Sequence, residues 1–148
     1  MISVRIQEGD FDPGAELARL EGLGGGALAS FIGLVRSDGG LIDMELEHYP
    51  GMTLKAVEAI VAEAVHRWPL LGVGVIHRHG RLKVGDRIVF VGVTSPRRAA
   101  ALEACAFLID WLKTGAPFWK RERFADGRAR WVEACASDDA AVARWVEA

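Results

Sequence analysis

Two lysines in one short stretch of the sequence are placed where they could transfer protons. The stretch reads Leu112-Lys113-Thr114-Gly115-Ala116-Pro117-Phe118-Trp119-Lys120-Arg121-Glu122. Lys113 closes a predicted helix, whose dipole favours the charged ammonium at that end. After a rigid Gly-Ala-Pro turn, Lys120 lies on a predicted strand beside Arg121, and like charge with partial burial would lower its pKa toward a useful range. A capping lysine followed by a basic edge strand is the alternative that charge and spacing leave open.

Positive charge is concentrated around these lysines. The chain has 18 Lys+Arg and 20 Asp+Glu, a net charge of −2, which argues against general nucleic-acid affinity. The segment 97–130 is nevertheless cationic, with basic side chains at Arg97, Arg98, Lys113, Lys120, Arg121, Arg123, Arg128 and Arg130. Such a band is typical of a site for a small anionic ligand or an acidic partner, although a solvated charged face gives the same pattern.

Other patterns that could carry chemistry are weaker. Gly22-x-Gly24-x-x-Ala27 matches the dinucleotide fingerprint, but it follows a predicted helix and precedes a strand, which is the wrong order for phosphate binding. His77-x-His79 lacks a third ligand at a recognisable spacing, so structural histidines are favoured over a metal site. No serine or cysteine lies in a nucleophile setting. Core packing accounts for the tryptophans better than base stacking does, at positions Trp68, Trp111, Trp119, Trp131 and Trp145.

The spacing of apolar residues predicts alternating strands and helices. Expected strands cover residues 2–6, 27–35, 42–49, 73–79, 87–94, 118–124 and 128–133, with 87–94 central because it is almost continuously apolar. Expected helices run from Pro13 to about Glu21, from a Thr53 cap to Pro69, over 97–113, and from near Asp138. We expect strand 42–49 to pair back as a hairpin, and Asp126-Gly127 to turn a second hairpin. This order predicts an α+β or mixed α/β fold with a largely antiparallel sheet.

Length and composition place the chain among ordinary globular proteins. Its 148 residues suit a single domain over 1–148, and 51% apolar with 26% charged residues excludes disorder and coiled coil. No stretch is apolar for long enough to span a bilayer, and the N-terminus is acidic where a signal peptide needs basic residues. Cys105 and Cys135 cannot form a disulfide framework, so we expect a reducing, cytoplasmic compartment.

Four ordered motifs give the chain a family resemblance. They are EHYPGMT (47–53), VIHRHG (75–80), GDRIVFVGVTS (85–95), and LKT followed by FWKRE (112–114 and 118–122). At this spacing the chain resembles the large, catalytic subunit of molybdopterin synthase, the MoaE family. The resemblance covers about residues 26–134.

The resemblance implies a sulfur transferase of molybdenum-cofactor biosynthesis. The implied substrate is cyclic pyranopterin monophosphate, and the sulfur donor is the C-terminal Gly-Gly thiocarboxylate of a small ubiquitin-like subunit. Two sulfurs form the dithiolene of molybdopterin, with one partner tail used for each. An α/β hammerhead-like fold with an added β-hairpin subdomain is implied, as is a homodimer within a heterotetramer. No protein cofactor, metal, nucleic acid or membrane is implied.

The resemblance also assigns site residues. The two catalytic lysines of the family fall on Lys113 and Lys120. Substrate contacts fall on Leu34, Val35, Arg36, Arg97, Arg98, Arg121 and Glu122, besides the two lysines. The position of Arg97 is often histidine in this family; an arginine there can bind phosphate but cannot act as a base near neutral pH.

A second class of function competes with the enzyme. A non-catalytic module could dock an acidic peptide tail on the basic strand, and arginine could then replace Lys113 and Lys120 without loss. The sequence does not divide the work between the two lysines, name the native small subunit, or say which residues cross a dimer interface.

Overall fold

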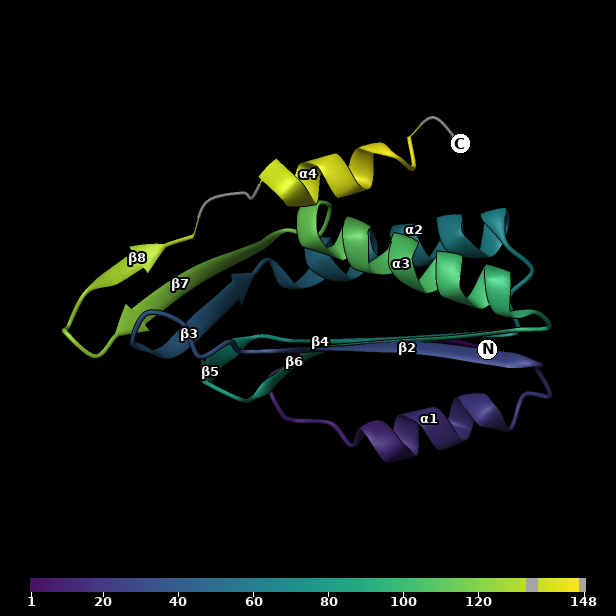
Figure 1. The fold of residues 1–148 in the computed structure, drawn as a ribbon, viewed down its shortest axis with the longest axis horizontal. Coiled ribbons are helices and arrows are strands. Elements are labelled where there is room, and N and C mark those ends of the chain that lie inside the picture. The colour runs from purple at the N-terminus through teal and green to yellow at the C-terminus, as the bar shows by residue number, and fades with distance from the viewer. Residues whose placement is uncertain (133–135, 147–148) are drawn as a thin grey trace.

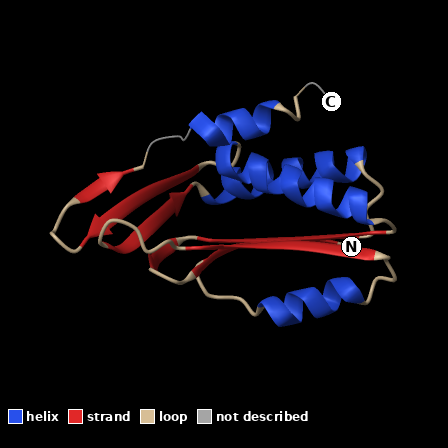
Figure 2. Cartoon of the chain, in the orientation of Figure 1, coloured by secondary structure: helices blue, strands red, loops and turns tan. Residues whose placement is uncertain are grey.

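The computed structural model describes residues 1–132 and 136–146 and contains two four-stranded sheets with helices on both faces of the first (Figure 2). The first sheet has the order β1 (Ile2–Gln7), β4 (Gly72–Arg78), β6 (Arg87–Ser95) and β2 (Ala27–Leu34). The second has the order β5 (Gly80–Lys83), β3 (Leu41–His48), β7 (Phe118–Phe124) and β8 (Ala129–Trp131). The described helices are α1 (Pro13–Glu21), α2 (Pro50–Arg67), α3 (Arg98–Thr114) and α4 (Ala136–Ala143).

The first sheet and its helices form what we call the body. Helix α1 covers one face of the sheet, and α2 and α3 cover the other (Figure 1). Strands β4 and β6 lie in the middle of the sheet and are buried over nearly their whole length, which is why they read as continuous apolar runs. Between the sheet and α2–α3 lies the main core, which includes Val57, Val75, Val91, Phe107 and Leu108.

Glycines in the first sheet allow α1 to pack closely on the face opposite α2 and α3. Leu20 is 2% exposed and lies over two glycines of the sheet. A Cβ at Gly92 would come within 2.5 Å of a Leu20 methyl group, and one at Gly72 within 2.3 Å of Leu23. Asp12 caps α1 as expected, with its carboxylate accepting a hydrogen bond from the Gly14 N–H at 3.0 Å.

The second sheet, which we call the arm, extends beyond one end of the body (Figure 1). Its core is small and consists of Val35, Leu41, Met44, Leu46 and Leu82. The side chain of Asp43 is buried, and its carboxylate accepts hydrogen bonds from Arg123 Nε at 2.8 Å and Arg123 Nη2 at 2.5 Å. The arm therefore combines a small apolar core with a buried carboxylate that is paired with an arginine.

The predicted α+β class and the largely antiparallel pairing are confirmed. Among the described strands, β1–β4 is the parallel pair, and the others pair antiparallel. Strand β6 is central, and Asp126-Gly127 turns the hairpin of β7 and β8, with Gly127 at φ +89°. The predicted end of that hairpin at Glu133 lies outside the described residues.

Two local expectations are wrong. Strand β3 does not pair back on β2; it crosses to the arm and pairs with β5 and β7, because the residues between them carry the chain past the end of the first sheet. Thr53 does not cap α2, which begins at Pro50 because proline suits the first helical position. Thr53 is instead fully buried, and its hydroxyl donates to the Pro117 carbonyl at 3.4 Å. Strand β5, which is four residues long, was not expected.

The C-terminal helix packs on α3. The Trp145 indole N–H donates to Asp110 Oδ2 at 2.7 Å, and its ring packs edge-on against Trp68 and Phe107. In the described part of the chain, no helix is long and apolar enough to cross a membrane.

Candidate functional site

Three elements bring cationic side chains together where the body meets the arm. Lys113 stands in the last turn of α3, which Gly115 closes with its N–H on the Trp111 carbonyl at 2.6 Å. Lys120 follows on β7, which starts just beyond that helix (Figure 1). Arg36 lies just after β2, and its charge acts on Lys120 together with that of Lys113. The structure therefore groups Lys113, Lys120 and Arg36.

Lys120 is the half-buried member of this group. Side chains at 118, 120, 122 and 124 of β7 are less exposed than those at 119, 121 and 123, so Lys120 projects to the inner face of the arm. Burial lowers its pKa first, and the charges of Lys113 and Arg36 lower it further. Glu122 and Asp138 act in the opposite direction. The expected direction of the shift is confirmed.

Arg121 is not the neighbour that causes this shift. It follows Lys120 on the strand and therefore projects to the opposite, exposed face. Glu122 shares the inner face with Lys120, and its carboxylate accepts a hydrogen bond from Arg130 Nε at 3.2 Å. Of the two predicted substrate contacts after Lys120, the structure places Glu122 beside the lysine and Arg121 away from it.

His77 is close enough for the charges of both lysines to act on it, and it was not predicted as a site residue. It is 8% exposed, and its ring stacks on Phe118 with centroids 3.8 Å apart and planes at 17°. Burial lowers its pKa to about 4, and the charges of Lys113 and Lys120 lower it in the same direction. The ring is therefore neutral at pH 7. The signal in the sequence is the His77-x-His79 pair at the end of a buried strand, a pattern that favours structural histidines.

Leu34, Val35 and Arg36 lead out of β2 toward the lysines. Val35 is buried, and its backbone is hydrogen-bonded to the turn after β5. The Val35 N–H donates to the Asp86 carbonyl, and the Gly85 N–H donates to the Val35 carbonyl, both at 2.9 Å. Leu34 is 54% exposed, and Arg36 is exposed. The fixed position of Val35 thus holds Arg36 at the margin of the site.

Arg97 and Arg98 lie at the N-terminal end of α3, the helix whose last turn contains Lys113. Arg97 is the N-cap of α3 and Arg98 is its first residue, and both are exposed. Lys113 is fifteen positions after Arg98 in the helix, which corresponds to roughly 22 Å along the axis. Within one chain, the structure does not bring these two arginines to the lysines.

The remaining candidate groups are the histidines and the cysteines. His48 and His79 face each other with ring centroids 4.4 Å apart, and burial lowers the pKa of His48. No group of His, Cys, Asp or Glu within the described residues is arranged to hold a metal ion. Cys105 is a buried free thiol whose pKa burial raises to about 11, so it is not a nucleophile. Cys135 lies outside the described residues.

Two of the tryptophans are not core residues. Trp119 is 42% exposed and Trp131 is 53% exposed, because both project from the outer face of the arm. They line a hollow of about 320 Å³ together with Glu47, His48 and Tyr49. Packing in the core is confirmed for Trp68, Trp111 and Trp145.

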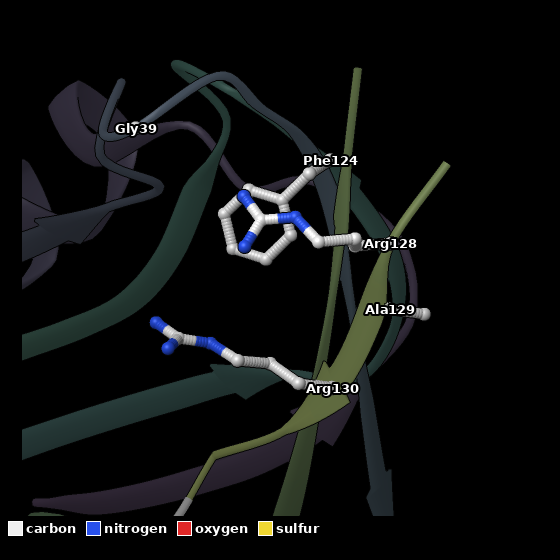
Figure 3. Close-up of a pocket in the computed structure, with 5 residues that line it drawn as sticks. All are labelled: Gly39, Phe124, Arg128, Ala129 and Arg130. Atoms are coloured by element: carbon white, nitrogen blue, oxygen red, sulfur yellow. The ribbon is translucent and has the colours of Figure 1, made fainter. Parts of the chain in front are cut away.

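A larger hollow of about 410 Å³ lies elsewhere on the arm, lined by Gly39, Phe124, Arg128, Ala129 and Arg130. Figure 3 shows the Arg128 guanidinium lying across the Phe124 ring, 5.2 Å from its centroid, with Arg130 reaching toward the same space. Both arginines are already paired, Arg128 with Asp126 at 2.6 Å and Arg130 with Glu122 at 3.1 Å. This hollow contains none of the predicted site residues.

Comparisons with known proteins show which family the chain belongs to. The family model described as "MoaE protein" matches residues 6–115. A curated molybdopterin synthase catalytic subunit from Pseudomonas aeruginosa is 52% identical, covering 99% of this chain and 100% of its own length. Another from Escherichia coli is 56% identical over 81% of each chain. The solved molybdopterin biosynthesis MoaE protein of Burkholderia ambifaria has a TM-score of 0.84 and 50% identity over 99% of both chains. The chain belongs to the MoaE family.

Proposed function

We propose that this protein is the catalytic subunit of a molybdopterin synthase, a sulfur transferase that converts cyclic pyranopterin monophosphate to molybdopterin. The observation that carries the proposal is the half-buried Lys120 with Lys113 and Arg36 beside it, in a chain half-identical to curated catalytic subunits. Burial weakens the charged form of Lys120, which suits a group that exchanges a proton, whereas docking an acidic tail requires no such shift. The sulfur donor is a small ubiquitin-like subunit with a C-terminal Gly-Gly thiocarboxylate.

The lysines serve the two steps at which negative charge develops. The thiocarboxylate sulfur forms a bond to a side-chain carbon of the pterin as a carbon–oxygen bond at that carbon breaks, and the departing oxygen takes a proton. Water then adds to the acyl carbon and cleaves its bond to that sulfur. The sulfur stays on the pterin, and the tail leaves as a carboxylate. A positioned ammonium stabilises the charge at each stage and can deliver a proton. Lys113 is the principal catalytic group, and Lys120 orients the substrate and exchanges protons. No resident metal or cofactor is required.

Arginines supply the phosphate contacts. Arg36 stands beside the lysines of its own chain, whereas Arg97 and Arg98 are a helix length away. We propose that Arg97 and Arg98 reach the lysines of a second protomer, so that a homodimer completes each site. Exposed arginines at a helix start suit a phosphate, because the free N–H groups of the first turn add to the attraction. Leu34, Val35, Arg121 and Glu122 complete the proposed contacts.

A mixing experiment tests the shared site. We expect Lys113→Ala and Arg98→Ala homodimers each to be impaired, and co-refolded mixtures of the two to regain activity, because a mixed dimer has one intact site. Each arginine replaced singly by alanine, at 36, 97 or 98, should weaken substrate binding by about 1.5–3 kcal/mol, with less effect at saturation. Mixtures no more active than the separate variants would place both groups in one chain's site or show the arginines to be uninvolved.

The proposal itself is tested by conversion in vitro. The purified chain is mixed with the pterin monophosphate and a thiocarboxylated small subunit, and the dithiolene product is measured. Product is expected with the thiocarboxylate and not with the same subunit ending in a carboxylate. Equal conversion with free sulfide, or none with any small subunit, would contradict it.

We further propose that residues 1–148 act as one domain in the cytoplasm. Ile88 supports the first part, because it packs against the cores of both the body and the arm. The burial of Cys105 as a free thiol is compatible with a reducing compartment.

A further inference from the structure

A buried histidine that the proposed mechanism leaves unused lies near the lysines. On β4, Val73 and Val75 face the α2–α3 layer, and the alternation of the strand places His77 on the same side. His77 stands where that face passes beyond the helices and meets the arm, with its ring stacked on Phe118. A phenylalanine would fill this place at lower cost, because a buried imidazole must be desolvated.

The hydrogen bond at one ring nitrogen fixes the state of the other. His77 Nδ1 lies 2.8 Å from the carbonyl oxygen of Arg78. A carbonyl oxygen can only accept, so Nδ1 carries the proton and donates it. In the neutral ring, Nε2 is therefore a hydrogen-bond acceptor with a lone pair. The Nδ1 contact is the hydrogen bond that this ring makes within the described residues, so Nε2 receives none there, from Lys120 or from another donor.

Lys120 is within reach of this acceptor. Lys120 is two residues from Phe118 and on the same face of β7, so the Cα atoms of Phe118 and Lys120 are about 6.6 Å apart. Because the ring of His77 stacks on Phe118, a lysine side chain can span this distance to the imidazole. The charged or titratable groups that act on His77 come from three elements: Lys113 on α3, Lys120 on β7 and His48 on β3. Those that act on Lys120 are Lys113, Glu122, Arg36 and Asp138.

We propose that His77 is a positioning residue for sulfur transfer: the Lys120 ammonium, which is not bonded to the ring in this structure, turns to donate a hydrogen bond to the Nε2 lone pair and is thereby held toward the substrate. The catalytic role of Lys120 in this inference rests on the proposed function, whereas the proposed hydrogen bond between Lys120 and His77 does not. The histidine does not take a proton from the lysine. It stays neutral and supplies a fixed acceptor in a place where a further positive charge would repel both lysines.

Two amide substitutions separate the two ring nitrogens. His77→Asn keeps a donor near the Nδ1 position and has no group at the Nε2 position, whereas His77→Gln reaches the Nε2 position with an acceptor oxygen. His77→Phe keeps the ring that stacks on Phe118 and removes both nitrogens. His79→Phe is the matched control, because His79 is a neighbouring histidine that faces His48 and not Phe118.

The contact is measured first on the protein alone, by the pH dependence of Lys120 acylation read by mass spectrometry. A neutral acceptor favours the ammonium, so its loss should move the midpoint for Lys120 down by about 0.5–1 pH unit in the Asn and Phe variants. The Gln variant and His79→Phe should match the unmodified chain. Equal midpoints in the Asn and Gln variants would overturn the proposal.

Turnover is measured second, with the pterin precursor and thiocarboxylated small subunit. We expect kcat to fall roughly 10-fold or more in the Asn and Phe variants, with affinity for the small subunit unchanged and activity largely restored by Gln. Equal kcat in the Asn and Gln variants would overturn a positioning role. If the unmodified chain made no product while the acylation midpoints still moved, the proposed function would fail and the His77–Lys120 contact would stand.

Discussion

The body and the arm each contain four strands but are held together differently. In the body, β4 and β6 are buried almost throughout, and large side chains such as Phe90 and Phe107 are no more than 1% exposed. In the arm, β7 alternates between half-buried and exposed residues, and β8 is exposed at all three positions. Burial of apolar surface is the larger source of stability, so the body is expected to hold the fold and the arm to depend on it.

The two lysines that we propose as catalytic come from opposite sides of this division. Lys113 ends a helix of the body, and Lys120 lies on a strand of the arm. His77 and Phe118, stacked on each other, are the corresponding pair near them. A site at such a junction combines a rigid support with a strand whose polar inner face can accept a charged ligand. The following predictions test that comparison.

The largest effect is expected in the core of the body. Phe107 is 1% exposed, and its ring packs edge-on against Trp68, Trp111 and Trp145. Phe107→Ala should lower the free energy of unfolding by about 3–5 kcal/mol, because it removes buried surface and leaves a cavity. Urea denaturation followed by tryptophan fluorescence measures this. A loss below about 1 kcal/mol would mean that the body does not carry most of the stability.

The next effect is on activity without a change in fold. Lys113→Arg keeps the positive charge at the end of α3, but a guanidinium does not donate a proton at neutral pH. We expect turnover to fall by roughly 10²-fold or more, with the melting temperature and small-subunit binding unchanged. Lys120→Ala should also be impaired, with a larger share of the loss in KM. Near-normal turnover in Lys113→Arg would replace proton transfer at that position with a purely electrostatic role.

The sequence predicted the body better than the arm, for a physical reason. The continuous apolar run of β6 and the Asp12-Pro13 start of α1 are local signals, and the structure contains both elements where they were expected. The pairing of β3 with β7 joins residues between 70 and 83 positions apart, and no local pattern specifies it. The strands of the arm are also half polar, so their hydrophobic pattern alone determines only weakly which strands pair with each other.

The candidate site could be predicted in part for the same reason. Lys113 and Lys120 stand close together in the sequence, so their motif was visible, and the resemblance supplied Arg36. His77 and Asp138 are brought to Lys120 by long-range packing and could not be found from spacing. The sequence also predicted that the adjacent Arg121 would lower the pKa of Lys120. Because side chains alternate along the strand, Arg121 projects to the opposite face instead.

A smaller effect is expected from acid on the arm. The Arg123 hydrogen bonds lower the pKa of Asp43 below its ordinary value of 3.8. A depressed carboxyl pKa gives stability that is complete above the unfolded-state pKa and is lost as the pH falls through the folded-state value. Asp43→Asn should therefore be less stable than the unmodified chain at pH 7, with the difference shrinking below about pH 4. Melting temperatures of both proteins between pH 7 and acid measure this, and a difference that stays constant would rule out the ion pair as its source.

The smallest effect is expected from the exposed aromatic face of the arm. Trp131 is as large as any core residue but is 53% exposed on β8 and belongs to no core cluster within the described residues. Its removal leaves no cavity, so Trp131→Ala should change the free energy of unfolding by no more than about 0.5 kcal/mol, against several for Phe107→Ala. The two variants are compared by urea denaturation at one protein concentration and again after tenfold dilution. A loss above about 2 kcal/mol for Trp131→Ala that shrinks on dilution would show that a second copy covers this face in solution, and the contrast between body and arm would then hold for the separate protomer only.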